Sequence, residues 1–428
     1  MIIKNSANYF KVISSDIGIL SHVVKLPRMN CDPRLIGYGI WAADSTQLGG
    51  GKFQGQSSGV GTTLNDAFLG TIGESLERYA AVFMNHKEVI TSSYNNLYKN
   101  ALHPNDCALF HDDQIKLKGF KIREFNRDIE VKWVPTYDLT TGEEIFCPAQ
   151  LIYLPSREAR YMSINTSTGL AAHTNFHESI LNGLYESIER DSFTISWAQK
   201  IVPPKIKINE DINRFISKHI SQGFEWHLFD MSYDLSASSV MGICFGEADF
   251  GKFIAVGAST RSTLGEAVKK TIIEIGQAIP FFRYQLEEKV GWNPQNFDDL
   301  TSFDDHAVFY TFRQDLWHIF NRHIQAKEDK EIDFNENENK QNTKEKIRRI
   351  VGDMKSKGYN VLVKDITTHD IRQLGFFATK VYIPQLIPLA GSYKYYYYGG
   401  KRLYEVPTKF GYKSHNFNNL NPFPHPFP

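Results

Sequence analysis

The feature that most constrains the fold of this chain is a helical segment that occurs twice with its charged residues in register. The first copy reads TLNDAFLGTIGESLERYAA and contains Glu74, Glu77 and Arg78. The second copy reads NFHESILNGLYESIERDSF and contains Glu186, Glu189 and Arg190. The offset is constant, because 186 − 74, 189 − 77 and 190 − 78 all equal 112. An E-x-x-E-R run on a helix places two carboxylates one turn apart on one face, with a guanidinium beside them.

A third stretch, STLGEAVKKTIIEIGQA, fits the same frame with Glu274 and Gln277, since 274 − 186 and 277 − 189 both equal 88. Surface helices often carry Glu and Arg at this spacing for a few tenths of a kcal/mol of stability. Here the surrounding positions are apolar, so the helices are expected to be largely buried, and buried acids need partners such as cations. The recurrence therefore favours a site that holds a hard cation and the phosphates bound to it.

Composition excludes several functional classes. The chain has 428 residues, with 42% hydrophobic and 22% charged residues, which is typical of a soluble globular protein with one large or two ordinary domains. Lys+Arg and Asp+Glu are both 48, which argues against a nucleic-acid binder. No signal peptide and no apolar run of about 18 residues is present, so we expect a cytoplasmic protein that does not enter a membrane. The cysteines are far apart, which indicates reduced thiols: Cys31, Cys107, Cys147 and Cys244.

Each copy of the helix follows a stretch of small residues: GQSSGVGTT, NTSTGLAAHT and VGASTRST. We interpret these stretches as loops whose backbone N–H groups, with the helix dipole, suit phosphate oxygens. None is a standard phosphate loop, because Gly51-Lys52 is followed by Phe53 and GVGTT lacks a third glycine. A bound nucleotide would therefore lie mainly among carboxylate-bearing helices.

The remaining pattern indicates an α+β fold of repeated strand-loop-helix units with mixed or antiparallel sheets. WVPTYDLTTGEEIFCPAQLIYLP predicts a hairpin, and FEWHLFDMS, SSVMGICFG, KFIAVGAS, YNVLVKDI and FFATKVYIP predict strands. IRRIVGDMKSKG predicts a helix. Tyr393 to Tyr398 predict a half-buried strand, with a peptide-lining surface as the alternative. A polar insertion is expected at about 327–347, and a proline-rich extended tail at 422–428. Residues 1–55 are expected to pack on a core domain of residues 56–428.

The chain resembles the YcaO family, and within it the azoline-forming cyclodehydratases of thiazole/oxazole-modified microcin biosynthesis. The resemblance rests on GTIGESLERYAA, STGLAAHTNFHESILNGLYESIERD, EAVKKTIIEIGQ, DITTHDIRQLGFFATKVYIPQLIPL with GGKRLYEVP, and a terminal PxPxP. It implies a YcaO-type ATP-binding fold with the three helical frames around one nucleotide site. The cofactors that it implies are ATP and Mg²⁺.

Site residues are carried over from the resemblance position by position. Those matching acids that hold Mg²⁺ are Glu74, Glu77, Glu186 and Glu189. Those expected around ATP are Glu74, Glu77, Arg78, Glu178, Glu186, Glu189, Arg190, Arg261, Lys270, Glu274 and Gln277. The tail prolines expected to act in catalysis are Pro424, Pro426 and Pro428. Two positions depart from the family pattern: Thr174 stands where an asparagine is expected, with Asn175 adjacent, and Lys270 stands where arginine is frequent.

The resemblance also implies the reaction and its partners. A Cys, Ser or Thr side chain of a precursor peptide attacks the preceding amide, the oxyanion takes the γ-phosphoryl group of ATP, and loss of phosphate leaves a thiazoline or oxazoline. The last residues, with the Pro428 carboxylate, are expected to order the site or move a proton. A ubiquitin-activating-enzyme-like segment is not recognised in the sequence, so we expect a separate leader-binding partner protein. A homodimer and a flavin dehydrogenase partner are further expectations.

Two alternatives stay open at this stage. One is a different reaction of the same family, such as ATP-dependent peptide thioamidation, against which the PxPxP tail argues. The other is a non-catalytic ATP-binding scaffold subunit, against which the intact acids in both repeats argue. Without the resemblance, the acid-bearing helices would indicate a metal-dependent hydrolase.

Overall fold

The computed structural model describes residues 10–16, 18–52, 55–97, 100–155, 162–164, 166–220, 223–336 and 341–428. Helices alternate with three sheets, which confirms the predicted α+β class. The first sheet is antiparallel and has the order β1 (Leu20–Lys25), β2 (Ile36–Ala42) and β3 (Gln56–Gly61). Because β2 pairs with β3, the expected boundary between residues 55 and 56 falls inside one sheet.

The second sheet has the order β11-β10-β9-β8-β12. Its strands are β8 (Lys205–Ile206), β9 (Glu225–Asp230), β10 (Ser238–Ala248), β11 (Gly251–Arg261) and β12 (Glu328–Lys330). The third sheet has the order β4-β5-β13-β14-β7, with β6 paired to the other edge of β5. Its strands are β4 (Ile90–Ser92), β5 (Val131–Asp138), β6 (Glu143–Pro148), β7 (Leu170–His173), β13 (Leu362–Asp365) and β14 (Phe377–Tyr382).

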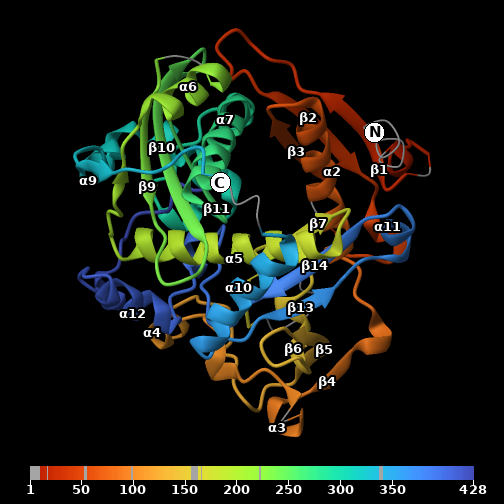
Figure 1. Cartoon of the computed structure of the whole chain (residues 1–428). Helices are drawn as coiled ribbons and strands as arrows, with labels where there is room; N and C mark the ends of the chain where they lie inside the picture. The colour runs from red at the N-terminus through yellow and green to blue at the C-terminus, as the bar shows by residue number, and fades with distance from the viewer. Residues whose placement is uncertain are drawn as a thin grey trace.

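Three long helices connect these sheets: α2 (Leu64–Ala81), α5 (Phe176–Ala198) and α7 (Leu264–Glu288). In Figure 1, α2 lies against the first sheet, α7 against the second, and α5 runs between these two layers and the third sheet. The shorter helices are α3 (Tyr94–Leu97), α4 (Asp112–Ile115), α6 (Glu210–His219), α8 (Phe303–Phe312), α9 (Asn321–Ile324), α10 (Thr343–Ser356), α11 (His369–Gln373) and α12 (Lys401–Lys409). Within the described residues, none of the helices is long and apolar enough to cross a bilayer.

The repeat seen in the sequence is also a repeat of local structure. Thr63, Asn175 and Thr263 are the N-cap residues of α2, α5 and α7, and each side chain accepts a hydrogen bond from a backbone N–H of the first turn. Each cap stands the same distance before the first acid of its frame, since 74 − 63, 186 − 175 and 274 − 263 are equal. Each helix therefore begins at the same position relative to its acids, so the acids lie at equivalent places in the three helices.

The small-residue stretches predicted as phosphate-binding loops are strands instead. GQSSGVG forms β3, VGASTR lies in β11, and part of the second stretch forms β7. Asn165, at the start of the second stretch, lies outside the described residues. The small residues serve close packing of strand on helix: a Cβ at Gly59 would stand 2.7 Å from the backbone nitrogen of Thr71 in α2. The small residues of these stretches therefore allow close packing and do not form phosphate-binding loops.

Most other predicted elements are confirmed. The hairpin is β5 and β6, the predicted strands are β9, β10, β11, β13 and β14, and the predicted helix lies in α10. The strand predicted for Tyr393 to Tyr398 is wrong, because Tyr393–Tyr395 form a 3-10 helix and Tyr396 and Tyr397 are buried. Within the polar insertion, β12 pairs with β8 and Phe334 is buried in the core, whereas residues 337–340 lie outside the described residues.

Candidate functional site

The two E-x-x-E-R runs adopt the same geometry on α2 and α5. The Arg78 guanidinium lies 3.9 Å from a Glu74 oxygen and 3.7 Å from a Glu77 oxygen. On α5, Arg190 lies 3.5 Å from Glu186 and 3.7 Å from Glu189. All four distances exceed a normal hydrogen bond between ions, so each arginine is shared loosely between two acids. Loose pairing leaves carboxylate oxygens available to a metal ion or its phosphate ligands.

The third frame faces the first across the site. The Lys270 amine lies 3.3 Å from a Glu274 oxygen and also acts electrostatically on Glu74 of α2. Gln277 donates through Nε2 to the backbone oxygen of Ser58 in β3, at 3.2 Å. Thus Gln277, the residue that replaces the second acid, joins α7 to the first sheet.

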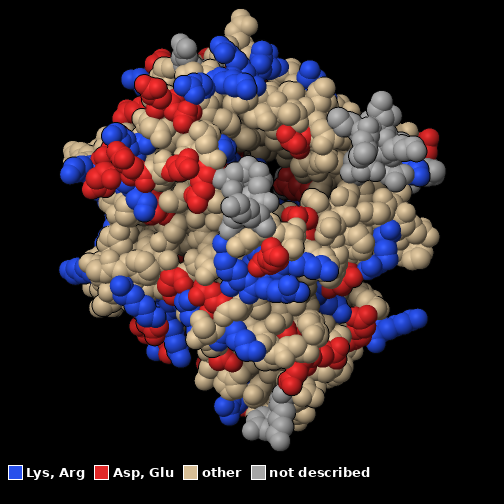
Figure 2. Space-filling model, viewed as in Figure 1, with Lys and Arg blue, Asp and Glu red and all other residues tan. Residues whose placement is uncertain are grey.

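The acids of α2, α5 and α7 are close enough to affect one another's charge. Glu186 acts on Glu74 and Glu77, while Glu274 and Glu186 act on Glu189. Figure 2 shows a hollow between the regions of α2 and α7, with Asp and Glu side chains inside it. The structure therefore gathers the three predicted frames around one depression.

Strand ends hold the acids of α5 in place. The backbone N–H of Gly169, next to β7, donates to Glu186 Oε2 at 2.9 Å. The backbone N–H of Thr260, in β11, donates to Glu189 Oε2 at 3.0 Å. These bonds fix one oxygen of each carboxylate and leave the other directed at Arg190.

Burial sets the protonation of these acids. It raises the pKa of Glu77 well above its ordinary value and that of Glu189 to about 8, because Arg78 and Arg190 compensate the lost hydration only in part. Burial also raises the pKa of Glu74, although 42% of this side chain is exposed. At neutral pH a carboxyl with such a raised pKa is largely protonated unless a cation lies beside it.

A Mg²⁺ ion beside these carboxyl groups would favour their ionised form. Mg²⁺ prefers carboxylate and phosphate oxygens and is usually held by one or two carboxylates plus substrate phosphates. No group of three or more His, Cys, Asp or Glu side chains among the described residues is arranged as a ready metal cage. The paired acids fit a Mg²⁺ ion that is held by one or two carboxylates together with phosphate oxygens. Glu77 and Glu189 are the acids most in need of it.

Lys380 is a site residue that the sequence reasoning missed. It lies in β14, is 1% exposed, and donates through Nζ to the backbone oxygens of Thr168 at 2.6 Å and Thr166 at 3.1 Å. Burial lowers its pKa to about 8, against the opposing effect of the Glu186 and Glu77 charges. A single lysine inside the apolar strand FATKVYI was the available signal.

Two predicted residues lie toward the edge of this group. Glu178, in the first turn of α5, accepts a hydrogen bond from the Thr343 hydroxyl at the start of α10. Arg261, at the end of β11, donates to the Thr260 backbone oxygen at 2.6 Å and acts on Glu189. Asn175, the neighbour of Thr174, is occupied as the cap of α5. Its side chain thus has a structural role here.

The proline-rich tail folds back into the body of the protein. The Tyr310 hydroxyl donates to the Pro424 backbone oxygen at 2.6 Å, and Pro426 is buried, whereas Pro428 is exposed. The Phe427 ring lies 4.2 Å from the Arg190 guanidinium, a cation–π contact. Phe427, rather than a proline, is thus the described tail residue in contact with the second E-x-x-E-R run. The catalytic role of the three prolines stays a prediction.

Fold and site together define an α+β protein whose acid-bearing helices enclose a site for a metal–nucleotide complex. A family model described as "YcaO cyclodehydratase, ATP- and Mg²⁺-binding" matches residues 58–387. The chain belongs to this family, which confirms the predicted family and its cofactors, ATP and Mg²⁺. The chain is also 26% identical over 195 residues to an uncharacterised protein of Methanothermobacter thermautotrophicus, covering 44% of this chain and 47% of that protein.

Solved structures share the fold. A heterocyclase in complex with substrate and cofactor has a TM-score of 0.78 and 20% identity, over 99% of this chain and 57% of that one. YcaO from Methanopyrus kandleri, bound with AMPPCP and Mg²⁺, has a TM-score of 0.62 and 18% identity, over 90% and 89%. The E. coli microcin synthetase McbBCD complex gives 0.60 and 17%, over 85% and 88%. The chain spans about half the length of the curated relative and of the heterocyclase.

Proposed function

We propose that this protein is an ATP-dependent peptide cyclodehydratase that converts Cys, Ser or Thr residues of a ribosomal precursor peptide into thiazolines or oxazolines. The side-chain nucleophile adds to the preceding amide carbonyl, and the amide oxygen takes the γ-phosphoryl group of ATP. Phosphate then leaves with that oxygen, so the net products are the azoline, ADP and phosphate. Phosphorylation is needed because an amide oxygen is otherwise a very poor leaving group.

The single observation that carries the proposal is the convergence of the three acid-bearing helices with the C-terminal tail on one site. Glu74, Glu77, Glu186 and Glu189 would hold Mg²⁺ and, through it, the phosphates. The guanidiniums of Arg78 and Arg190 would neutralise charge on the transferred phosphoryl group. Phe427 against Arg190 would couple the tail to that group.

The proposal includes partners. Because the similar McbBCD assembly is a complex, which has also been described with pro-MccB17 bound, a precursor peptide and a separate leader-binding protein are proposed here too. A homodimer and a flavin dehydrogenase that later oxidises the azolines complete the proposed assembly.

The test uses the purified protein with Mg²⁺, ATP and a Cys/Ser/Thr-rich precursor peptide, to be sought among the genes that neighbour its own, with and without the partner protein. We expect the peptide to lose the mass of one water for each ring, and one ADP to form for each ring. Ring formation should depend strongly on the partner protein. Glu189→Gln should abolish both products, whereas Glu225→Gln, an exposed acid of β9, should leave them unchanged. ATP binding without ring formation by the wild type would contradict the proposed reaction.

A further inference from the structure

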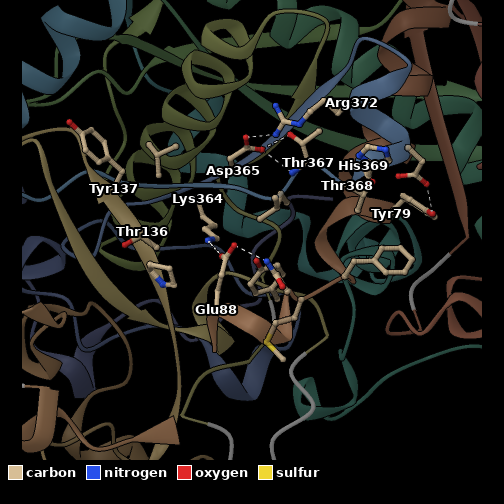
Figure 3. Close-up of a pocket in the computed structure, with 18 of the residues that line it drawn as sticks. Tyr79, Glu88, Thr136, Tyr137, Lys364, Asp365, Thr367, Thr368, His369 and Arg372 are labelled. Atoms are coloured by element: carbon tan, nitrogen blue, oxygen red, sulfur yellow. Dashed lines mark hydrogen bonds and ion pairs between the residues drawn. The ribbon is translucent and has the colours of Figure 1, made fainter. Parts of the chain in front are cut away.

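A second cavity lies apart from the acid-bearing hollow. Its volume is about 970 Å³, at the upper end of the range for ligand sites. It opens where α2 ends and where β5, β13 and α11 meet. The lining includes Tyr79, Glu88, Thr136, Lys364, Asp365 and Arg372 (Figure 3).

The cavity exists because two neighbouring strands separate. β13 pairs with β5 only at Leu362↔Asp138 and Val363↔Tyr137. β13 nevertheless continues to pair with β14 as far as Asp365, and β5 continues to pair with β6 back to Trp133. Along the edge of β5, β4 pairs again only at residues 131–133. A gap therefore stands in the middle of the sheet.

Proline explains where the pairing stops. If the register continued, Asp365 would lie opposite Pro135, which has no N–H to donate. The alternation of the ladder fixes the direction of the Asp365 backbone. Ile366 N–H bonds to Ala378 O toward β14, so the N–H and C=O of Asp365 point the other way, into the cavity. Within the part of the chain that the structure describes, Asp365 thus presents an unpaired main-chain N–H and C=O inside a concave site.

Most of the charged side chains around this edge form ion pairs with one another. Lys364 lies 2.5 Å from Glu88 across the gap, and Arg372 lies 2.6 Å from Asp365. Figure 3 shows both pairs at the wall of the cavity. What remains for a ligand is mainly main-chain hydrogen bonding, which does not select a small ion.

We propose that this cavity binds an extended segment of the precursor peptide, which pairs as a strand with β13 through the free main-chain groups of Asp365. Strand addition gives affinity through main-chain hydrogen bonds and tolerates varied side chains. A peptide modified at several positions needs that tolerance, so the inference rests on the proposed function. The cavity would hold the substrate while residues further along the peptide reach the nucleotide site.

The first test removes the main-chain donor. Asp365→Pro lacks the N–H, whereas Asp365→Ala keeps the N–H and loses the same side-chain bonds to Thr367 and Arg372. Binding of the fluorescein-labelled precursor peptide is measured by anisotropy, and binding of Mg–ATP by calorimetry. We expect Asp365→Pro to weaken peptide binding about tenfold relative to Asp365→Ala, with equal Mg–ATP affinity. Equal peptide affinities would overturn the inference.

A second test does not depend on the proline variant folding. The photocrosslinker p-benzoylphenylalanine replaces Tyr137, whose side chain is 51% exposed at the cavity, or Tyr284 of α7, equally exposed elsewhere. We expect the precursor peptide to crosslink at position 137 and not at 284. Absence of crosslinking at 137 would contradict the inference even if rings form. Crosslinking without ring formation would leave the inference standing and count against the proposed reaction.

Discussion

At the scale of single residues, the site depends on buried carboxyl groups that need positive charge beside them to ionise. Lys380 supplies part of it from β14, and its amine also ties down the backbone at residues 166–168. A buried cation between acids is costly to remove, because the acids then lose a counter-charge in a poorly hydrated place.

We therefore predict that Lys380→Met lowers the free energy of unfolding by about 3 kcal/mol. The same variant should weaken Mg–ATP binding about tenfold, because the backbone beside Glu186 loses its anchor. Urea denaturation and calorimetry measure the two effects. Lys364→Met is the matched control, since Lys364 is the register partner of Lys380 but pairs with Glu88 outside the site. Equal Mg–ATP affinity in the two variants would show that Lys380 has a structural role only.

At the scale of elements, α5 and the C-terminal tail form one unit. Trp197 of α5 donates to the Phe423 backbone oxygen at 3.0 Å, and Phe193 packs on Phe427 with ring centroids 4.8 Å apart. Arg190 lies on the same helix and contacts the Phe427 ring. The order of the tail and the position of Arg190 are therefore linked.

The element-scale prediction concerns this contact. Phe427→Ala should lower the rate of ring formation about thirtyfold, since a desolvated cation–π contact is worth about 2 kcal/mol and positions Arg190. Phe423→Ala alters the same tail without reaching Arg190, and its ring formation should fall less than twofold. Single-turnover assays at saturating ATP measure the difference. If both variants lose rate equally, the tail only stabilises the fold.

At the scale of the whole molecule, neutral histidine side chains anchor the tail in the core. His425 donates through Nε2 to the Ala390 backbone oxygen and accepts the Phe427 N–H at Nδ1, and its ring stacks on His306. Burial lowers the pKa of His425 to about 4, and that of His306 well below its ordinary value. Protonation of either ring would break this arrangement.

The sign of the resulting pH dependence follows from linkage. Between about pH 6.5 and about 4, the unfolded chain binds a proton at residue 425 and the folded chain does not. Stability should therefore fall as pH falls through this window, by about 1.4 kcal/mol per pH unit for this residue. His425→Asn should lose that part of the slope. Urea denaturation of both proteins from pH 7 to pH 4 measures it, and parallel curves would contradict the buried neutral state.

The sequence by itself determined the features that depend on local periodicity. The recurring acid-bearing segments predicted the helices and their buried faces. They also predicted the common register in which Glu74, Glu186 and Glu274 occupy equivalent positions. Alternating apolar residues fixed most of the strands. The roles of the individual site residues stay predictions.

Only the tertiary structure decided how distant segments meet. The apolar strand around Lys380 indicates that this lysine is buried but not what it contacts, and nothing local distinguishes Phe427 from any aromatic residue between prolines. The partners of both residues lie more than 200 residues away in the chain. The small residues of GQSSGVG showed the same limit, since close packing of strand on helix and a phosphate loop both require glycine. The gap between β5 and β13 also needed the sheet register, because a proline matters there only through the residue opposite it.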